Sequence, residues 1–372
     1  MAKKNVSILD FGSEKLTIMS GFRDVNNTIS VLAKMEENYE GFSEGEFLEP
    51  KKLEVKIVDA IKKYEANNGI KIKELTVGVP TEFCYATCKN VSKTFPKLKK
   101  INKADIENLY NSLLDTDIKT HQLINKGYVY FVLGENNKVN NPIGQVSSKI
   151  TACLSFIYVE KGFINLVNKA LNKIGIYKIN YVSSAYAQSL YLFDDEQRDN
   201  YALLVDCGYI TTSVSLIRGR GILNLSSFSL GGGHISADLS VCLKIPFQSA
   251  ETLNRKIVLS VEPSNKDMYD LLVDGEVIPI SMRVANAIVE SRIEVIANGI
   301  QKCFNSWKFD FPNFISIYLT GGGVSFIRGA KDYISKVLGK NIELAVNPYS
   351  IYNKPNNSSS MAVLNYSLEQ SC

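Results

Sequence analysis

The sequence is poor in the residues that build metal centres and disulfide frameworks. Its two histidines, His121 and His234, lie far apart in the chain, which argues against a histidine-based zinc site. The seven cysteines are odd in number and widely spaced, and no second pair matches Cys84 and Cys88. This usage is typical of a reduced cytoplasmic protein in which cysteines serve as small apolar residues.

Long hydrophobic runs and a large excess of charge are also missing. No apolar leader follows Met1, and no run reaches the roughly 18 apolar residues that indicate a membrane span. We therefore expect neither a secreted nor a membrane-spanning protein. The net charge is +4 over 372 residues, which does not favour nucleic acid as a partner. The basic stretch 97–103 is interpreted as a solvated face.

One pattern occurs twice: an apolar strand, an aspartate, a tight turn and a second strand. Residues 5–21 contain it with Asp10 at the end of the first strand, and residues 201–218 contain it with Asp206 in the same place. The two units stand about half the chain apart, and each is followed by segments with helical spacing. This arrangement predicts two similar α/β lobes that face each other. The main segments with helical spacing are 50–68, 161–175 and 280–305.

Residues 84–160 differ in composition and in apolar spacing from the chain on either side. They begin with a Lys-rich stretch, continue with helical spacing over 104–114, and end in short alternating strands at 127–133 and 148–159. The segment is therefore expected to be a small α+β insertion.

The turn after each aspartate carries residue types that suit a phosphate. Glycine lets backbone N–H groups approach an anion closely, hydroxyls donate further hydrogen bonds, and Lys15 adds a positive charge. A carboxylate beside phosphates needs a cation between them, so Asp10 and Asp206 are predicted to hold Mg²⁺. Asp206 is also the candidate catalytic residue, because water attacking a terminal phosphate depends on orientation and charge neutralisation. The predicted phosphate-binding residues are Gly12, Ser13, Lys15, Gly208, Thr211 and Thr212.

Two glycine clusters complete the candidate site. Each is weak alone, because glycines mostly punctuate turns and the two aspartates could simply cap them. Their order after the two Asp hairpins is much more specific, and the second cluster lies between a strand and a helix, where backbone amides receive phosphate or ribose. The clusters are Gly231, Gly232 and Gly233, and Gly321, Gly322 and Gly323.

This order of motifs resembles the actin, Hsp70 and sugar-kinase superfamily, and within it the FtsA family of bacterial cell-division proteins. ILDFGSEKLTIMSG (8–21) and LLVDCGYITTSVSLIRG (203–219) are similar to its two phosphate segments, and IYLTGGGVSFIRGAKDYI (317–334) to its adenosine segment. The family also carries an early inserted subdomain with an NPIG-like turn, which stands here at 141–144.

The resemblance implies an α/β, actin-like, two-lobed ATPase fold with an FtsA-type insertion in the first lobe. The first lobe would comprise 1–83, 161–200 and 345–372, with 84–160 inserted. The second lobe would comprise 201–238 and 296–344, with 239–295 as its accessory subdomain. Residues 361–368 are expected to close the first lobe, because no Lys or Arg follows Lys354 to form the basic membrane-binding helix of the family.

The resemblance further implies an ATP- and Mg²⁺-binding protein that polymerises and links the FtsZ ring to the membrane or divisome. It implies binding of the C-terminal tail of FtsZ and of other divisome proteins, in the cytoplasm and peripherally at the inner face of the membrane. Glu251 matches the acid that contacts ribose, and Arg255 stands in for a lysine expected at Asn254.

Two departures from the family bear on hydrolysis. Tyr209 and Ile210 replace glycines in the second phosphate turn, and Ser213 stands where an acid is common. At most a weak ATPase is therefore expected. The alternative is a non-hydrolysing actin-like filament protein or a pilus-assembly adaptor of the PilM type, which shares the insertion. A sugar kinase or Hsp70-like enzyme is a third reading, but no clear second-substrate signature supports it.

Overall fold

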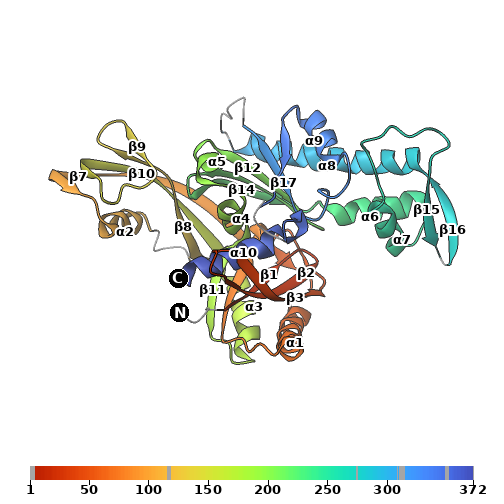
Figure 1. The fold of residues 1–372 in the computed structure, drawn as a ribbon, viewed down its shortest axis with the longest axis horizontal. Helices are drawn as coiled ribbons and strands as arrows, with labels where there is room; N and C mark the ends of the chain where they lie inside the picture. The colour runs from red at the N-terminus through yellow and green to blue at the C-terminus, as the bar shows by residue number, and fades with distance from the viewer. Residues whose placement is uncertain are drawn as a thin grey trace.

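The computed structural model describes residues 5–371 except 115–118, 274, 308, 310–314 and 348–351. Figure 1 shows an elongated molecule with two central sheets, an extended sheet at one end and a long helix with a small hairpin at the other. Among the helices of these residues, none is long and apolar enough to cross a membrane.

The first central sheet has five strands in the order β11-β6-β1-β2-β3. Strands β1 and β2 form an antiparallel hairpin, as predicted, and β6 lies parallel to β1 on its other side. The strands are β1 (Val6–Phe11), β2 (Lys15–Arg23), β3 (Ile29–Asn38), β6 (Glu74–Val79) and β11 (Lys178–Ser183).

Helices cover both faces of this sheet, which explains why β1 is apolar almost throughout. Leu9 and Phe11 pack with α1 (Pro50–Asn68) and α3 (Lys161–Asn172). Val6 and Ile8 point to the other face and pack with α4 (Ser184–Leu192) and α10 (Ser358–Gln370).

Residues 361–368 do close the first lobe, as expected. They lie within α10, and Met361, Val363 and Leu364 are buried in the same core cluster as Ile8. This placement brings the start of α10 beside the carboxyl end of β1, where the candidate site lies.

The second central sheet repeats this plan with the order β14-β13-β12-β17-β18. Strands β12 and β13 form the second predicted hairpin, and β17 lies parallel to β12. Helices α6, α7, α8 and α9 cover one face through a continuous apolar core. The strands are β12 (Ala202–Cys207), β13 (Thr212–Arg218), β14 (Gly221–Phe228), β17 (Ile317–Thr320) and β18 (Ile342–Leu344). The helices are α6 (Gly232–Leu243), α7 (Phe247–Asn254), α8 (Met282–Ser306) and α9 (Ala330–Leu338).

The segment 84–160 folds as a four-stranded antiparallel sheet with one helix, in the order β7-β10-β8-β9. The expected Lys-rich stretch is one 17-residue strand, which the sequence pattern did not indicate. Phe95 is buried on the side of α2, and Lys99 pairs with Asp105 of that helix. The elements are β7 (Cys84–Lys100), α2 (Lys103–Ser112), β8 (His121–Leu133), β9 (Asn137–Val139) and β10 (Val146–Glu160).

The inserted sheet docks onto the β13–β14 turn of the second lobe. The backbone N–H of Arg220 donates to the carbonyl of Tyr128 at 2.8 Å, and the Ser155 hydroxyl donates to the carbonyl of Ile222 at 2.8 Å. The approach is so close that a Cβ on Gly127 would lie 2.0 Å from the Arg220 carbonyl oxygen. The insertion therefore contacts both lobes.

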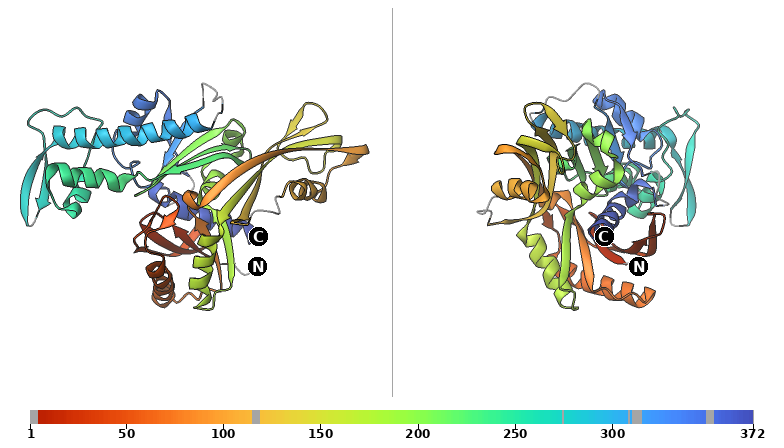
Figure 2. Two further views of the ribbon diagram at one scale, coloured as in Figure 1. Left: turned by 180° about the vertical axis from the view of Figure 1, so that it is seen from behind. Right: turned by 60° about the vertical axis from the view of Figure 1, so that its left-hand side comes forward.

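Small elements complete the chain. A hairpin of β15 (Met268–Val273) and β16 (Glu276–Ser281) forms the end of the molecule opposite the inserted sheet (Figure 2). The others are β4 (Phe42–Ser43), β5 (Glu46–Phe47), α5 (Asp195–Asp199) and 3-10 turns at Thr81–Phe83 and Pro355–Asn357. We propose that the chain divides into four parts: the first lobe, its insertion at 84–160, the second lobe, and the accessory subdomain at 239–295.

Candidate functional site

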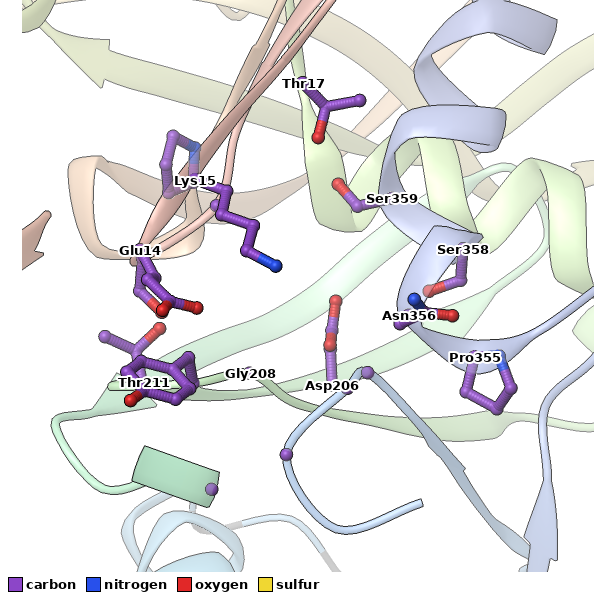
Figure 3. Close-up of a pocket in the computed structure, with 18 of the residues that line it drawn as sticks. Glu14, Lys15, Thr17, Asp206, Gly208, Thr211, Pro355, Asn356, Ser358 and Ser359 are labelled. Carbon is purple, nitrogen blue, oxygen red and sulfur yellow. The ribbon is translucent and has the colours of Figure 1, made fainter. Parts of the chain in front are cut away.

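A cavity of about 1030 Å³ lies between the two central sheets, at the turns that follow Asp10 and Asp206. Both hairpins, both aspartates and residues from the start of α10 line it (Figure 3). The predicted site residues at its wall are Asp10, Gly12, Ser13, Lys15, Asp206, Gly208, Thr211, Gly232, Glu251, Arg255, Gly321, Gly322 and Gly323.

The two turns are built in the same way. The N–H of Gly12 donates to the carbonyl of Lys15 at 2.8 Å, and the N–H of Gly208 donates to the carbonyl of Thr211 at 2.8 Å. A Cβ on Gly12 or on Gly208 would lie 3.1 Å from the carbonyl oxygen that its own N–H contacts. Both turns therefore need a residue without a side chain at the same step after the aspartate.

Asp10 is buried, with 4% of its surface exposed. Ser184 of α4 donates to its Oδ1 at 3.1 Å. Burial raises the pKa of Asp10 to about 6, hydrogen bonds from Ser359 and Ser184 oppose this, and the charge of Asp206 adds to it. A Cβ on Gly78 would lie 2.3 Å from Oδ1, so the neighbouring strand is shaped around this carboxylate.

Asp206 stands in the middle of the cavity, with Lys15 and Glu14 on one side and Ser358 on the other (Figure 3). Burial raises the pKa of Asp206, and a hydrogen bond from Gln188 partly offsets this. The Gln188 amide donates to Oδ2 at 2.6 Å and to the Ser358 hydroxyl at 3.0 Å. Gln188 of α4 thus links Asp206 of the second lobe to Ser358 of α10 in the first lobe.

Two desolvated carboxylates that face one cavity suit a divalent cation. Mg²⁺ usually takes one or two carboxylates and fills its remaining positions with water and phosphate oxygens. Within the described ranges no group of three or more His, Cys, Asp or Glu could hold a metal by itself, so phosphate or water oxygens would have to complete the coordination. The donor set of Asp10 and Asp206 fits that requirement.

Charged groups from both lobes line the other end of the cavity. The Nζ atom of Lys15 lies 3.7 Å from Oε2 of Glu36, and the Lys15 side chain is partly exposed. Burial raises the pKa of Glu14, and Lys15 partly opposes this. On the second lobe Tyr209 donates its hydroxyl to Glu251 at 2.7 Å, beside Arg255.

The glycine clusters hold the second turn by backbone contacts. The N–H of Gly232 donates to the carbonyl of Gly208 at 3.0 Å, and that of Gly323 to the carbonyl of Cys207 at 2.7 Å. A Cβ on Gly232 would lie 2.6 Å from the backbone of Gly323, so both clusters meet at one point. A Cβ on Gly321 would lie 2.3 Å from Oδ1 of Asp206.

Three predicted residues do not line the cavity, which corrects the sequence analysis. Thr212 is fully buried and its hydroxyl donates to the carbonyl of Leu230 at 2.6 Å, because neighbouring strand residues point to opposite faces. Thr211 and Ser213, on either side of it, line the cavity. Gly231 precedes α6 and donates its N–H to Nδ1 of His234. Gly233 packs against the Tyr209 ring.

The sequence patterns did not indicate the polar residues that the first lobe contributes from outside its hairpin. They come from α4 and from the run NKPNNSSS (353–360), which leads into the apolar part of α10. That abrupt change in polarity was the available signal. The residues are Ser184, Gln188, Lys354, Asn356, Ser358, Ser359 and Ser360.

Comparison with known proteins agrees with the geometry. The family model for cell division protein FtsA matches residues 203–362. FtsA of Enterococcus hirae is 21% identical over 354 residues, which cover 93% of this chain and 79% of that protein. FtsA of Streptococcus pneumoniae is 21% identical, with 91% and 74% covered. The chain is therefore similar to the FtsA proteins over most of its length.

Solved structures show that the FtsA-like chain has the actin-like fold. PilM in the PilM–PilN type IV pilus biogenesis complex matches with a TM-score of 0.58 at 14% identity and 98% coverage of both chains. MreB5 of Spiroplasma citri, solved with AMPPNP, matches with 0.57 at 12% identity, covering 99% of this chain and 97% of that one. MamK, solved as a double helical filament, matches with 0.56 at 11% identity, covering 99% and 98%.

The raised pKa of Asp10 predicts an unusual dependence of stability on pH. Its native pKa of about 6 lies above the ordinary 3.8, so between these values the native state binds the proton more tightly than the unfolded state. The free energy of unfolding should fall as pH rises from about 4 to about 6. Without divalent cation, Asp10→Asn should be more stable than the wild type at pH 7, by on the order of 1 to 3 kcal/mol.

Urea unfolding of both proteins at several pH values in EDTA measures this. Asp332→Asn, an exposed change on α9, is the matched control and should leave the pH profile of the wild type unchanged. Parallel pH profiles for Asp10→Asn and the wild type would contradict the buried, proton-binding state of Asp10.

Proposed function

We propose that this FtsA-like chain binds ATP with Mg²⁺ between its two lobes, self-associates and acts as an adaptor in cell division. The observation that carries the proposal is the pair of matching Asp turns, which converge on one cavity from two lobes of the same plan. The FtsA relatives and the actin-like neighbours support the same reading.

The lining residues suggest how the ligand would be held. Asp10 and Asp206 would hold the metal directly or through water, and the turns at Gly12–Lys15 and Gly208–Thr211 would surround the phosphates. Glu251, Arg255 and the glycines 321–323 would contact the nucleoside. MreB5 was solved with AMPPNP and with ADP, which supports a nucleotide as the ligand of this fold.

The chain's own residues would orient the phosphates more readily than they would promote hydrolysis. When bound, Mg²⁺ would supply positive charge that neutralises the phosphates and lowers the cost of ionising Asp10 and Asp206. Gln188 and Ser184 fix the orientation of Asp206 and Asp10. Tyr209 and Ile210 crowd the second turn, so hydrolysis should be weak at most.

Self-association end to end is supported by the two ends of the molecule. The tip of the inserted sheet exposes Leu98 and Val146 beside Lys97 and Lys100. The hairpin β15–β16 at the opposite end exposes Leu272 and Val277 together with Asp270 and Glu276, and its strands contain no Lys or Arg. Complementary, non-closing contacts of this kind build filaments.

The remaining partners rest on the likeness to the FtsA proteins alone. The second lobe would bind the C-terminal tail of FtsZ, and other divisome proteins would bind elsewhere. The protein would act in the cytoplasm, peripherally at the inner face of the membrane.

A PilM-like adaptor of pilus assembly is the second candidate. The specific observation in its favour is the structural match to PilM over 98% of both chains. The matched sequence relatives favour cell division, because they are named as FtsA proteins. A pull-down with a peptide of the FtsZ tail and with PilN distinguishes the two functions.

Replacing Asp206 tests the nucleotide site most directly. Asp206→Asn should weaken binding of Mg·ATP by about tenfold or more, because one carboxylate ligand of the metal is lost. Isothermal titration calorimetry with ATP, with Mg²⁺ and with EDTA, measures the effect. The difference in ATP affinity between Asp206→Asn and the wild type should be smaller in EDTA, because no metal is then bound.

Asp332→Asn serves as the matched surface control, and thermal unfolding checks that each variant is folded. Equal Mg·ATP affinity of Asp206→Asn and the wild type would contradict the metal role. Absence of ATP binding by the folded wild type at millimolar concentration would contradict the proposed function itself.

Charge reversal tests the end-to-end contact. Lys97→Glu with Lys100→Glu should lower the sedimented fraction of the protein at least severalfold, and so should Asp270→Lys with Glu276→Lys. A mixture of the two double variants should recover assembly in heterotypic pairs. Pelleting and electron microscopy measure this, with exposed Lys302→Glu as control. Undiminished sedimentation of both double variants would place the contact elsewhere.

A further inference from the structure

The turn between β12 and β13 contacts both lobes, which a phosphate-binding turn of one lobe need not do. It carries Tyr209 and Ile210, two bulky residues, between Gly208 and Thr211. Each of these two residues makes a separate set of contacts, one within the second lobe and one across the cleft.

Tyr209 fixes the turn to the second lobe. Its hydroxyl donates to Oε1 of Glu251 at 2.7 Å, and its carbonyl accepts the N–H of Gly233 at 2.8 Å. A Cβ on Gly233 would lie 2.9 Å from the Tyr209 ring, so the ring rests directly on the start of α6. Burial and the neighbouring Glu251 both raise the pKa of Tyr209, so the hydroxyl keeps its proton for this bond.

Ile210 ties the same turn to the first lobe. Its backbone N–H donates to Oγ of Ser13 at 2.9 Å, across the cleft. Its Cδ1 atom would lie 3.2 Å from a Cβ on Gly41, in the loop that follows β3. Gly41 has φ +81°, and a Cβ there would lie 2.1 Å from the Ser13 carbonyl oxygen, so this loop, the Ser13 turn and Ile210 are packed together.

A second group of bonds crosses between the lobes nearby. The Ser229 hydroxyl, just beyond β14, lies 3.0 Å from that of Ser43 and accepts the N–H of Glu44 at 3.2 Å. It also contacts Oε1 of Glu82 at 3.4 Å, and Oε2 of Glu82 accepts the N–H of Gly45. Two segments of the first lobe, the β4–β5 turn and Glu82, therefore meet one serine of the second lobe.

These contacts engage the groups that a nucleotide would use. The Ser13 hydroxyl and the Ile210 amide satisfy each other at the point where the two phosphate turns meet, and the Glu251 carboxylate already accepts the Tyr209 hydroxyl. In a protein whose lobes separate freely, these groups would form hydrogen bonds with water instead. A bound phosphate would then be needed to connect the two turns.

We infer that Tyr209 and Ile210 form a clasp that holds the two lobes closed without nucleotide. The placement of the clasp inside a nucleotide site rests on the proposed function, but the clasp itself rests only on the contacts across the cleft. It follows that nucleotide competes with the clasp, and that the closed arrangement of the lobes does not depend on ATP.

The test compares the separation of the lobes in the absence of nucleotide. One fluorophore pair is attached at position 302 on α8 and position 62 on α1, and energy transfer and small-angle scattering are measured. The variants are Ser13→Ala, which removes the acceptor for Ile210, and Tyr209→Gly with Ile210→Gly, which removes both side chains. Ser306→Ala and Tyr333→Phe, both outside the cavity, are the matched controls.

We expect the wild type and the controls to give the closed distance both with and without Mg·ATP. The double glycine variant should give lower energy transfer without ligand and return to the wild-type value with Mg·ATP, and it should bind Mg·ATP about fivefold to tenfold more tightly. Ser13→Ala should also open without ligand. A wild type as open as the double variant in the absence of ligand, or a double variant as closed as the wild type, would overturn the clasp.

These results separate the clasp from the proposed function. If calorimetry detects no ATP binding to any of the proteins, the nucleotide function fails, while the comparison of unliganded wild type and variants still decides the clasp. If all proteins bind Mg·ATP with the same affinity and the same lobe distance, the function stands and the clasp fails.

Discussion

The structure depends on one electrostatic constraint: two desolvated carboxylates, Asp10 and Asp206, face the same cavity from different lobes. Asp10 and Asp206 each lose hydration, and the charge of Asp206 further raises the cost of ionising Asp10. Hydrogen bonds from Ser184 and Gln188 offset part of that cost. Added positive charge, such as that of a divalent cation, would let both carboxylates ionise together.

The rest of the fold supplies the two carboxylates from independent lobes. Each comes from the end of the first strand of a hairpin, and a parallel strand packs on the other side of that strand. The inserted sheet contacts the β13–β14 turn and joins the lobes behind the cleft, while Ser13 and Ile210 join them at its front. The cavity and the contacts between the lobes therefore share a few short turns.

Much of this could be predicted from local patterns. The two Asp hairpins and the helix at Pro50–Asn68 follow from apolar spacing and turn residues, which act over neighbouring positions. The 17-residue strand β7 was not predicted, because its many lysines are typical of a solvated segment. The burial of Phe95 depends on contact with α2, which the local sequence does not specify. The burial of Thr212 and the approach of Ser358 depend on contacts between segments far apart in the chain, which a sequence pattern does not specify.

The most direct measurement is a crystal structure of the protein with Mn²⁺ and a non-hydrolysable ATP analogue, with the metal located by anomalous scattering. The account predicts one strong anomalous peak between the carboxylates of Asp10 and Asp206, with the analogue's phosphates completing the coordination. Nucleotide without a metal peak at that position, or a metal bound away from both aspartates, would contradict it.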